Sequence, residues 1–277
     1  GSIAAWGDNS YGQTNVSKGN DFVAIAAGGS HSLALRGDAS VREAIAARLK
    51  ATSTGRNIRD NGQDGFPAGS KTSTYIPKRQ AFVAIAARGF HNLALRRDGS
   101  IVAWGDSWGY YSFGLTNVPT GKGFVAIAAG GFHSLALQKD GSIAAWGGNK
   151  NHFEANVPEG NDFVAIAAGT YHSLALRRNG SIVAWGDDKF DRMDVPWGTD
   201  YVAIAAGEDH NIALLRDVIR DGCTIIARGN NDFGQTNVPE GYDFVAITAG
   251  KRHSLALRKN GSIVAWGDNS CGQTNVP

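Results

Sequence analysis

One sequence unit recurs through this chain and constrains its fold more than any other feature. The segment FVAIAAGGSHSLAL begins at Phe22 and returns in similar form at Phe82, Phe124, Phe163, Tyr201 and Phe244. A second segment, close to GSIVAWGDNSYGQTNVP, follows the copies and also opens the chain. Its copy at Gly222 is degenerate and has Arg228 where the others have Trp. A repeat of about 40 residues is typical of propellers, solenoids and repeat arrays.

Each unit predicts four short β-strands. FVAIAA is rich in β-forming residues and ends at Gly, and HSLALR alternates apolar and polar residues. An Asp-Gly or Asn-Gly pair follows, as at Asp140-Gly141, and supplies the positive φ angles of a two-residue hairpin. SIVAWG is the third predicted strand, and TNV, which a Pro usually ends, is a short edge strand. We therefore expect all-β blades of four antiparallel strands.

Such blades must pack against one another. A single blade cannot bury both faces, and radial closure protects the strand edges. We therefore expect one β-propeller domain over residues 1–277. Seven blades are favoured and six are the alternative, because a degenerate Trp-strand segment after Asp38 adds to six clearer ones. A parallel β-helix would need much shorter repeats.

The charge balance and cysteine content exclude several classes of protein. Lys and Arg number 27 against 25 Asp and Glu, and neither terminus is basic, so we expect no nucleic-acid partner. No run of 18 apolar residues is present, so we expect no membrane span. A signal-peptide pattern is absent as well, which leaves a cytoplasmic location and secretion after processing both open. Cys223 and Cys271 replace Ser or Tyr of sister repeats and are expected to be free thiols in a monomeric protein.

The repeat resembles a known family. The pattern Gly-x-x-His-Ser-Leu-Ala-Leu, then Asp-Gly, then Ala-Trp-Gly-Asp-Asn-x-x-Gly-Gln is similar to the regulator of chromosome condensation repeat and covers nearly the whole chain. The resemblance implies a seven-bladed propeller. The compact unit ending in Gln-Thr-Asn-Val-Pro is most similar to bacterial members, including the propeller-type β-lactamase inhibitor proteins. It implies no particular partner, because such propellers host unrelated functions.

Two sets of repeated side chains are expected to be structural. Every hairpin carries a histidine at one position, and one histidine per blade spreads them around a ring instead of gathering them at a metal or catalytic site. We expect each imidazole to bridge backbone groups at its turn. The serine that follows most of these histidines points to the opposite face of its strand, which argues against a nucleophile pair. The tryptophans, at positions such as Trp146 and Trp266, are expected to pack between blades.

The candidate partner-binding residues lie where the repeats differ. Strand direction places the turn between FVAIAAG and HSLAL, and the loop after Trp-Gly, on one face of the ring. Exposed aromatic side chains beside charged pairs on a rigid scaffold are typical of protein-binding surfaces. The predicted residues are Phe90, Phe132, Tyr171, Glu208, Asp209, Lys251, Arg252, Tyr11, Trp108, Tyr110, Phe153 and Phe233. The alternative is that these loop residues have diverged without a role in binding and pack against their own loops.

Residues 41–80 depart from the repeat. They contain eight Lys or Arg and three Asp or Glu, a net charge of +5. In the eukaryotic namesake of the family a protrusion from one blade inserts into a small GTPase, so this basic excursion could act in a similar way. The alternative is a degenerate blade segment with a solvated loop.

These patterns favour a non-enzymatic protein-binding scaffold, with enzyme inhibition of the β-lactamase-binding type as one form of it. The sequence contains no P-loop, zinc-ligand spacing or nucleophile elbow, so we expect no catalytic residue, no metal and no cofactor. Nucleotide exchange on a small GTPase and carbohydrate binding are the alternatives.

Overall fold

The repeats form three-stranded antiparallel sheets. The computed structural model describes residues 3–7, 22–27, 31–36, 82–89, 91–105, 114–148 and 156–276. Each FVAIAA segment pairs with the HSLAL strand that follows it, and the Trp-strand pairs with the other edge of HSLAL. The described residues form six such sheets, which confirms an all-β repeat fold and leaves the predicted blade count untested.

The strand bounds follow the repeats closely. The first strands of the units are β2 (Phe22–Ala27), β4 (Phe82–Arg88), β7 (Phe124–Ala129), β10 (Phe163–Ala168), β13 (Tyr201–Ala206) and β16 (Phe244–Ala249). The middle strands are β3 (His31–Arg36), β5 (His91–Arg96), β8 (His133–Gln138), β11 (His172–Arg177), β14 (His210–Asp217) and β17 (His253–Arg258). The Trp-strands and their equivalents are β1 (Ile3–Gly7), β6 (Ile101–Gly105), β9 (Ile143–Gly147), β12 (Ile182–Gly186), β15 (Gly222–Gly229) and β18 (Ile263–Gly267).

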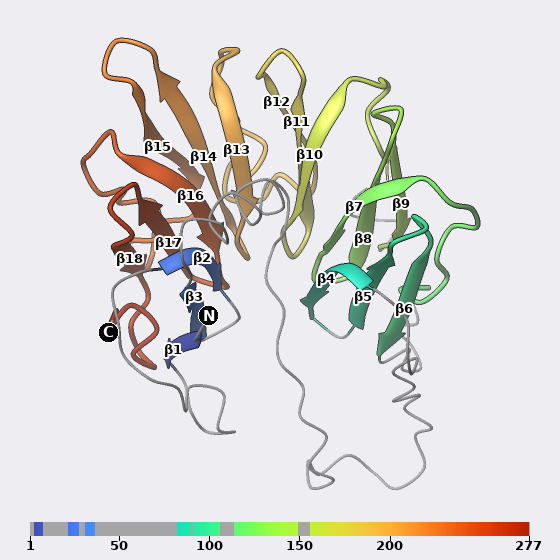
Figure 1. Ribbon diagram of the computed structural model, residues 1–277, viewed down its shortest axis with the longest axis horizontal. Coiled ribbons are helices and arrows are strands. Elements are labelled where there is room, and N and C mark those ends of the chain that lie inside the picture. Colours follow the sequence, from blue (N-terminus) through green and yellow to red (C-terminus); the bar gives the residue numbers. More distant parts are fainter. Residues whose placement is uncertain are drawn as a thin grey trace, which may run out of the picture.

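The sheets lie side by side around an arc (Figure 1). From β4–β6 to β16–β18 they pack in chain order, and β2 lies against β16 and β17. The N-terminal strand β1 pairs with β3, with Ile3 opposite Leu35, and so completes the sheet of β2 and β3. The first Trp-strand therefore joins the hairpin that follows it in the chain, an arrangement that the repeat order did not suggest.

The core consists of apolar layers between neighbouring sheets. Between β4–β6 and β7–β9, for example, Leu93, Ile127 and Ala136 are fully buried. Burying one Leu or Ile side chain stabilises the fold by about 1.5–3 kcal/mol. Because each layer needs two sheets, no sheet could bury its apolar side chains alone. The alanines of the inner strands fit the crowding near the centre of a propeller.

The prediction that TNV forms a fourth strand is wrong for the copies of this segment that the structure describes. Residues 116–118 and 236–238 have turn or irregular backbone, and their amides bond locally. The amide of Asn237 donates to the Gly234 carbonyl at 3.1 Å, and the amide of Val238 donates to the Thr236 carbonyl at 2.9 Å. The Pro that follows has no amide to donate to a ladder. A segment whose donors are used within its own loop cannot extend a sheet.

The histidines link neighbouring sheets through side chains, not through the backbone groups that we expected. His91 Nε2 lies 2.6 Å from Ser134 Oγ of the next sheet, and His133 Nε2 lies 2.8 Å from Ser173 Oγ. The series continues along the arc with two further pairs. These are His172 with Asn211 Oδ1 at 2.6 Å and His210 with Ser254 Oγ at 2.8 Å.

The bonding partners indicate which imidazole nitrogen carries the proton. Asn211 donates its Nδ2 hydrogen to the Arg192 carbonyl, so its Oδ1 must accept from His172 Nε2–H. Burial lowers the pKa of His172 to about 3, so the ring is neutral at pH 7. The histidines are thus structural, as predicted, and each described Nε2 bond crosses a sheet boundary.

Removing one acceptor of this series should cost stability. Ser173→Ala leaves His133 Nε2 buried without the Ser173 hydroxyl, so we expect the free energy of unfolding to fall by about 1–3 kcal/mol. Ser181→Ala is the matched control, because the Ser181 hydroxyl bonds Asn179 in an exposed turn. The control should change the free energy by less than about 0.5 kcal/mol in urea denaturation. Equal effects of the two variants would contradict a structural role for the inter-sheet bond.

Candidate functional site

The hairpin turns and the loops after the Trp-strands lie at one end of the sheets, which we call the turn face. The Asp187 amide donates to the Tyr171 carbonyl at 2.9 Å, and the Asn230 amide donates to the Asp209 carbonyl at 2.8 Å. Each bond joins a loop to the hairpin turn of its own sheet. The hairpin turns and the loops after the Trp-strands therefore lie on the same face, as the strand directions predicted.

Arg192 is the most deeply buried charged side chain of the described turn face. It is 1% exposed and stands at the repeat position that holds Gln in sister units, where Gln235 is also 1% exposed. Its guanidinium lies 3.8 Å from Asp187 and 3.5 Å from Asp209, and its Nε donates to the Lys189 carbonyl. A buried cation needs such partners, because desolvation of an unpaired charge is costly.

Two aromatic rings lie near this guanidinium, and a third stacks on one of them. Phe132 stacks on Tyr171 with ring centroids 5.2 Å apart and an interplanar angle of 25°. The Arg192 guanidinium carbon lies 5.6 Å from the Tyr171 centroid and 5.7 Å from that of Phe190. Lys189 Nζ also lies over the Phe190 ring, 4.9 Å from its centroid. We call Phe132, Tyr171, Lys189, Phe190 and Arg192 the Arg192 cluster.

The loop that carries this cluster has an unusual backbone. Phe190 has a φ of 65° and Asp191 a φ of 55°, both in the left-handed region. Sister loops place Gly at the second position, with a φ of 77° at Gly234 and 75° at Gly272. Left-handed non-glycine residues are strained and persist only where their surroundings hold them. The bonds of Arg192 to Lys189 and Asp187 supply that restraint.

A second group joins the two C-terminal sheets. Glu208 lies 3.5 Å from Lys251 Nζ and 3.3 Å from Arg252 Nε, and its amide donates to the Lys251 carbonyl at 3.0 Å. Arg252 in turn lies 4.6 Å from the ring centroid of Phe233. We call these four residues the Glu208 cluster. Because its salt bridges are half-exposed, their role is to orient side chains more than to stabilise the fold.

Two further charges lie between these clusters. Burial raises the pKa of Asp209, and the Arg192 charge opposes that shift. Arg88, which stands where sister repeats have Gly, donates from its Nη1 to the Ala206 carbonyl at 2.8 Å and to the Ala168 carbonyl at 3.2 Å. Burial lowers the pKa of Arg88 to about 10. From β4, Arg88 thus reaches the ends of β10 and β13 and ties three sheets together.

The structure brings several predicted residues together. Phe132 meets Tyr171, Asp209 meets Arg192, and the remaining described ones form the Glu208 cluster. Five predicted residues lie outside the described residues, namely Tyr11, Phe90, Trp108, Tyr110 and Phe153. The sequence analysis missed Arg88, Lys189 and Arg192. Comparison of the repeats could have found two of them, because Arg88 replaces a Gly and Arg192 replaces a Gln.

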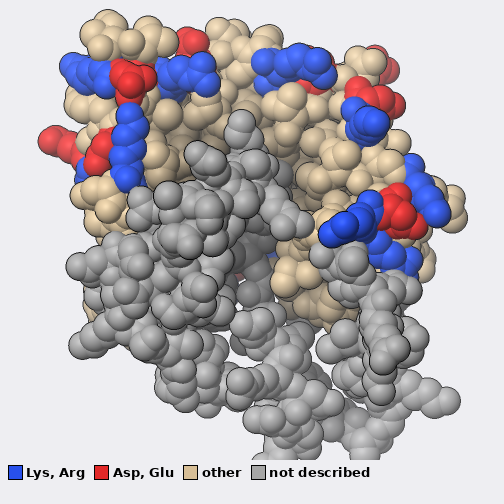
Figure 2. Space-filling model, viewed as in Figure 1, with Lys and Arg blue, Asp and Glu red and all other residues tan. Residues whose placement is uncertain are grey.

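Other features of the described residues bear on function class. They contain no group of three or more His, Cys, Asp or Glu side chains placed to hold a metal ion. Among them there is also no helix long and apolar enough to cross a membrane. Figure 2 shows Lys and Arg beside Asp and Glu along the upper rim of the face in view, without a large patch of one sign over its described part.

Comparison with a family model supports the resemblance noted in the sequence. The model for the regulator of chromosome condensation (RCC1) repeat matches residues 124–152, 163–191 and 244–273. These segments contain the sheets β7–β9, β10–β12 and β16–β18. The three are RCC1 repeats. The degenerate unit of β13–β15, which has Arg228 in place of Trp, is not among the matched segments.

Solved structures of yeast RCC1 and of a receptor kinase ectodomain have a similar fold. Yeast RCC1 (Prp20), solved with Kap60 bound, has a TM-score of 0.64 at 21% identity, covering 98% of this chain and 79% of that one. Prp20p from Saccharomyces cerevisiae, in a study of its binding to Gsp1p and histones, has a TM-score of 0.56 at 22% identity over 68% of this chain. The receptor kinase CR4 ectodomain of Physcomitrella patens has a TM-score of 0.55, also at 22% identity, over 69% of this chain.

These identities establish the fold alone. The match spans 57% of the Prp20p chain and 52% of the CR4 ectodomain chain. A comparison with curated protein sequences finds no match. The similar structures just described come from yeast and a moss, so the predicted likeness to bacterial inhibitor proteins receives no support from them.

Proposed function

We propose that this RCC1-repeat protein is a non-enzymatic scaffold whose turn face binds a protein partner. The Arg192 cluster is the observation that carries the proposal. Phe190 is 43% exposed, yet its backbone is held in a strained conformation beside a fully buried arginine. An exposed ring that is fixed before binding loses little conformational entropy when a partner covers it.

The composition of the turn face supports the same proposal. Binding hot spots are enriched in Tyr, Trp and Arg, and they lie on surfaces that a rigid scaffold presents. The Glu208 cluster extends the surface to a second sheet, where Phe233 is 42% exposed. RCC1-type propellers bind proteins, as the complex of Prp20 with Kap60 illustrates. The identity of the partner here is a separate question.

Binding should depend on the half-buried Tyr171 ring and the exposed Phe190 ring of the Arg192 cluster. We expect Tyr171→Ala combined with Phe190→Ala to weaken a captured partner more than about tenfold, because truncated hot-spot residues commonly cost 2 kcal/mol or more. Trp197→Ala is the control, since Trp197 is 98% exposed and lies toward the Asp-Gly turns, at the opposite end of the sheets. The measurement compares the proteins retained by each variant at equal loading. If the Trp197→Ala variant loses the partner and the Tyr171→Ala/Phe190→Ala variant retains it, the turn face is not the binding site.

Direct assays separate the finer possibilities. Inhibition of a purified β-lactamase would support an inhibitor function, and accelerated nucleotide release from a small GTPase would support exchange activity. A variant that lacks residues 48–74 tests whether exchange depends on the basic excursion. Binding to a glycan array with one site per repeat would instead favour the carbohydrate alternative and contradict the proposal.

A further inference from the structure

Three Asn-Gly pairs occur in the chain, and two of them form hairpin turns of the described sheets. Asn179-Gly180 joins β11 to β12, and Asn260-Gly261 joins β17 to β18. The third pair, Asn61-Gly62, lies outside the described residues. An asparagine before glycine readily loses its side-chain amide, because glycine has no side chain to shield its backbone nitrogen. Both described asparagines are exposed, so their turns are candidate sites of chemical modification.

The reaction requires no reactant other than water. After losing its proton, the Gly180 nitrogen attacks Cγ of Asn179, the bond from Cγ to Nδ2 breaks, and ammonia leaves with that proton. The product is a five-membered succinimide ring. Water then opens the ring at one of its two carbonyl carbons, the nitrogen regains a proton, and the new carboxylic acid releases one to solvent. Opening at Cγ gives Asp, and opening at the backbone carbonyl gives isoaspartate.

The folded turn holds both reacting groups in hydrogen bonds. The Gly180 amide donates to the Arg177 carbonyl at 2.9 Å. Oδ1 of Asn179 accepts from the Ser181 amide at 2.9 Å and from the Ser181 hydroxyl at 2.8 Å. These bonds protect the amide hydrogen from base and keep the side chain from turning toward the Gly180 nitrogen. Attack therefore requires the turn to open first.

The turn at Asn260 is built in the same way. The Gly261 amide donates to the Arg258 carbonyl at 2.9 Å. Oδ1 of Asn260 accepts from the Ser262 amide at 2.9 Å and from the Ser262 hydroxyl at 2.7 Å. We therefore expect the two sites to react by one route and under the same restraint.

Two sister turns already contain the Asp product. Asp140 accepts from the Ser142 amide at 2.9 Å and from its hydroxyl at 2.7 Å, and Asp98 accepts from Ser100 at 3.0 and 2.7 Å. The bonds from Ser100 lower the pKa of Asp98 to about 2, so that carboxylate is charged at pH 7. An Asp formed from Asn179 would meet the same two donors and should leave its turn unchanged.

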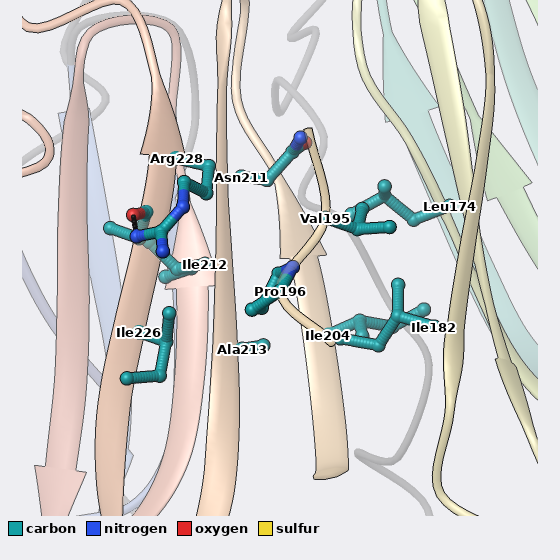
Figure 3. Close-up of a pocket in the computed structure, with 11 residues that line it drawn as sticks. Leu174, Ile182, Val195, Pro196, Ile204, Asn211, Ile212, Ala213, Ile226 and Arg228 are labelled. Carbon is teal, nitrogen blue, oxygen red and sulfur yellow. Dashed lines mark hydrogen bonds between the residues drawn. The ribbon is translucent and has the colours of Figure 1, made fainter. Parts of the chain in front are cut away.

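Isoaspartate should not fit the turn at Asn179. It adds one atom to the backbone before Gly180, whose carbonyl accepts the Tyr201 amide of the next sheet at 3.2 Å. Ile182, at the start of β12, packs against the buried Ile204 of β13 (Figure 3). A displaced turn would therefore loosen the contact between β10–β12 and β13–β15.

We propose that Asn179 and Asn260 are deamidation sites, that they react with water only when their turns open, and that only the Asp product preserves the fold. Conversion at both sites would lower the formal net charge from +2 to zero. The Asn-Gly turns lie at the opposite end of the sheets from the turn face. The proposal therefore does not rest on the binding of a partner there.

Incubation of the full chain at mildly alkaline pH, followed by peptide mass mapping, tests the rate. The folded chain is compared with the same chain unfolded in guanidinium chloride. We expect both asparagines to convert in the unfolded chain, and to convert at least about tenfold more slowly in the folded chain, because only the opened fraction reacts. Equal rates would overturn the proposal, and so would a lack of conversion in the unfolded chain.

Two variants test the fit of the Asp product. Asn179→Asp should leave the midpoint of urea unfolding at pH 7 unchanged, because the carboxylate accepts the same hydrogen bonds. Asn179→Ala is the matched control and should lower the midpoint, because both bonds from Ser181 are lost. A midpoint lowered equally by the two variants would contradict the proposal.

Brief proteolysis of the incubated chain in increasing urea compares the two products. Peptides that carry isoaspartate in place of Asn179 should be released at lower urea than those that carry Asp. Release of both at the same urea concentration would show that isoaspartate fits the turn, and this result would also overturn the proposal.

Discussion

Lowering the pH from 7 to 5 is expected to remove about 8 kcal/mol from the free energy of unfolding and to unfold the chain. The cause is the series of buried histidines that joins the sheets. Burial lowers the pKa of His91 to about 4 and lowers those of His133, His172 and His210 to about 3. Each has an ordinary pKa of 6.5 when the chain is unfolded.

The direction of the effect follows from these values. A histidine whose pKa is lower in the folded chain takes up a proton on unfolding whenever the pH lies between the two values. Its contribution to stability is complete above pH 6.5 and is lost progressively toward pH 4 or 3. At pH 5 each ring costs about 2 kcal/mol, and four rings together approach the 5–15 kcal/mol that typically stabilise a domain.

Proton uptake on unfolding is the decisive measurement. Unfolding at pH 5.5 in buffers of different ionisation enthalpy should show uptake of about four protons, which corresponds to a slope of about 5 kcal/mol per pH unit. Carboxylates with a lowered pKa, such as Asp98, whose value is about 2, titrate at lower pH and contribute little here. Uptake near zero above pH 5 would show that the histidines are not buried in their neutral form.

The fold was predictable because its signals are local and repeated. An Asp-Gly or Asn-Gly pair between HSLAL and a Trp-strand identifies a hairpin, and four units agree. The predicted two-residue loop is wrong, because the Arg177 amide bonds the Ser181 carbonyl across a loop of three residues in which only Gly180 has a positive φ. TNV misled because its β-propensity is outweighed by hydrogen bonds within its own loop, as the amides of Asn237 and Val238 show. The β-propensity of a segment does not include these competing hydrogen bonds, since they form only when the loop has closed.

The partners of the histidines could not be predicted from one unit. His133 and Ser134 are neighbours in the chain, but they point to opposite faces of their strand and bond to different sheets. The relation between His91 and Ser134 exists only after the sheets are placed side by side. Sequence periodicity therefore predicts that these residues are structural, but not what they contact.

The candidate site shows the same limit. Phe132 and Tyr171 were found because exposed loop aromatics are visible in sequence. Arg192 was overlooked because an arginine in a loop is ordinarily solvated. Its burial arises only because neighbouring turns place the Tyr171 ring and the Asp209 carboxylate beside it. Alignment of the units at the Gln position would have marked it as an exception.

Gly180→Ala is expected to lower the free energy of unfolding by more than about 3 kcal/mol. Gly180 ends the Asn-Gly turn between β11 and β12 and has a φ of 86°. A Cβ atom there would lie 1.8 Å from the carbonyl oxygen of Thr199. That carbonyl belongs to the segment entering β13, and Tyr201 of the same segment donates its amide to Gly180. The clash is between two backbones, so relief requires one sheet to move away from the next.

Gly234→Ala separates this clash from simple backbone strain. Gly234 has a similar φ of 77°, but a Cβ there would meet only the side-chain nitrogen of Asn237, at 3.3 Å. The control should therefore show only the cost of a left-handed alanine, about 1–2 kcal/mol. Chemical denaturation of both variants measures the difference. If the Gly180→Ala and Gly234→Ala variants lose equal stability, the segment before β13 can move away from the added Cβ atom at no energetic cost. The contact between the turn at Gly180 and the neighbouring sheet would then not hold the arc together. If Gly180→Ala loses far more, contact between backbones sets the spacing of sheets whose side chains tolerate an arginine in place of a tryptophan.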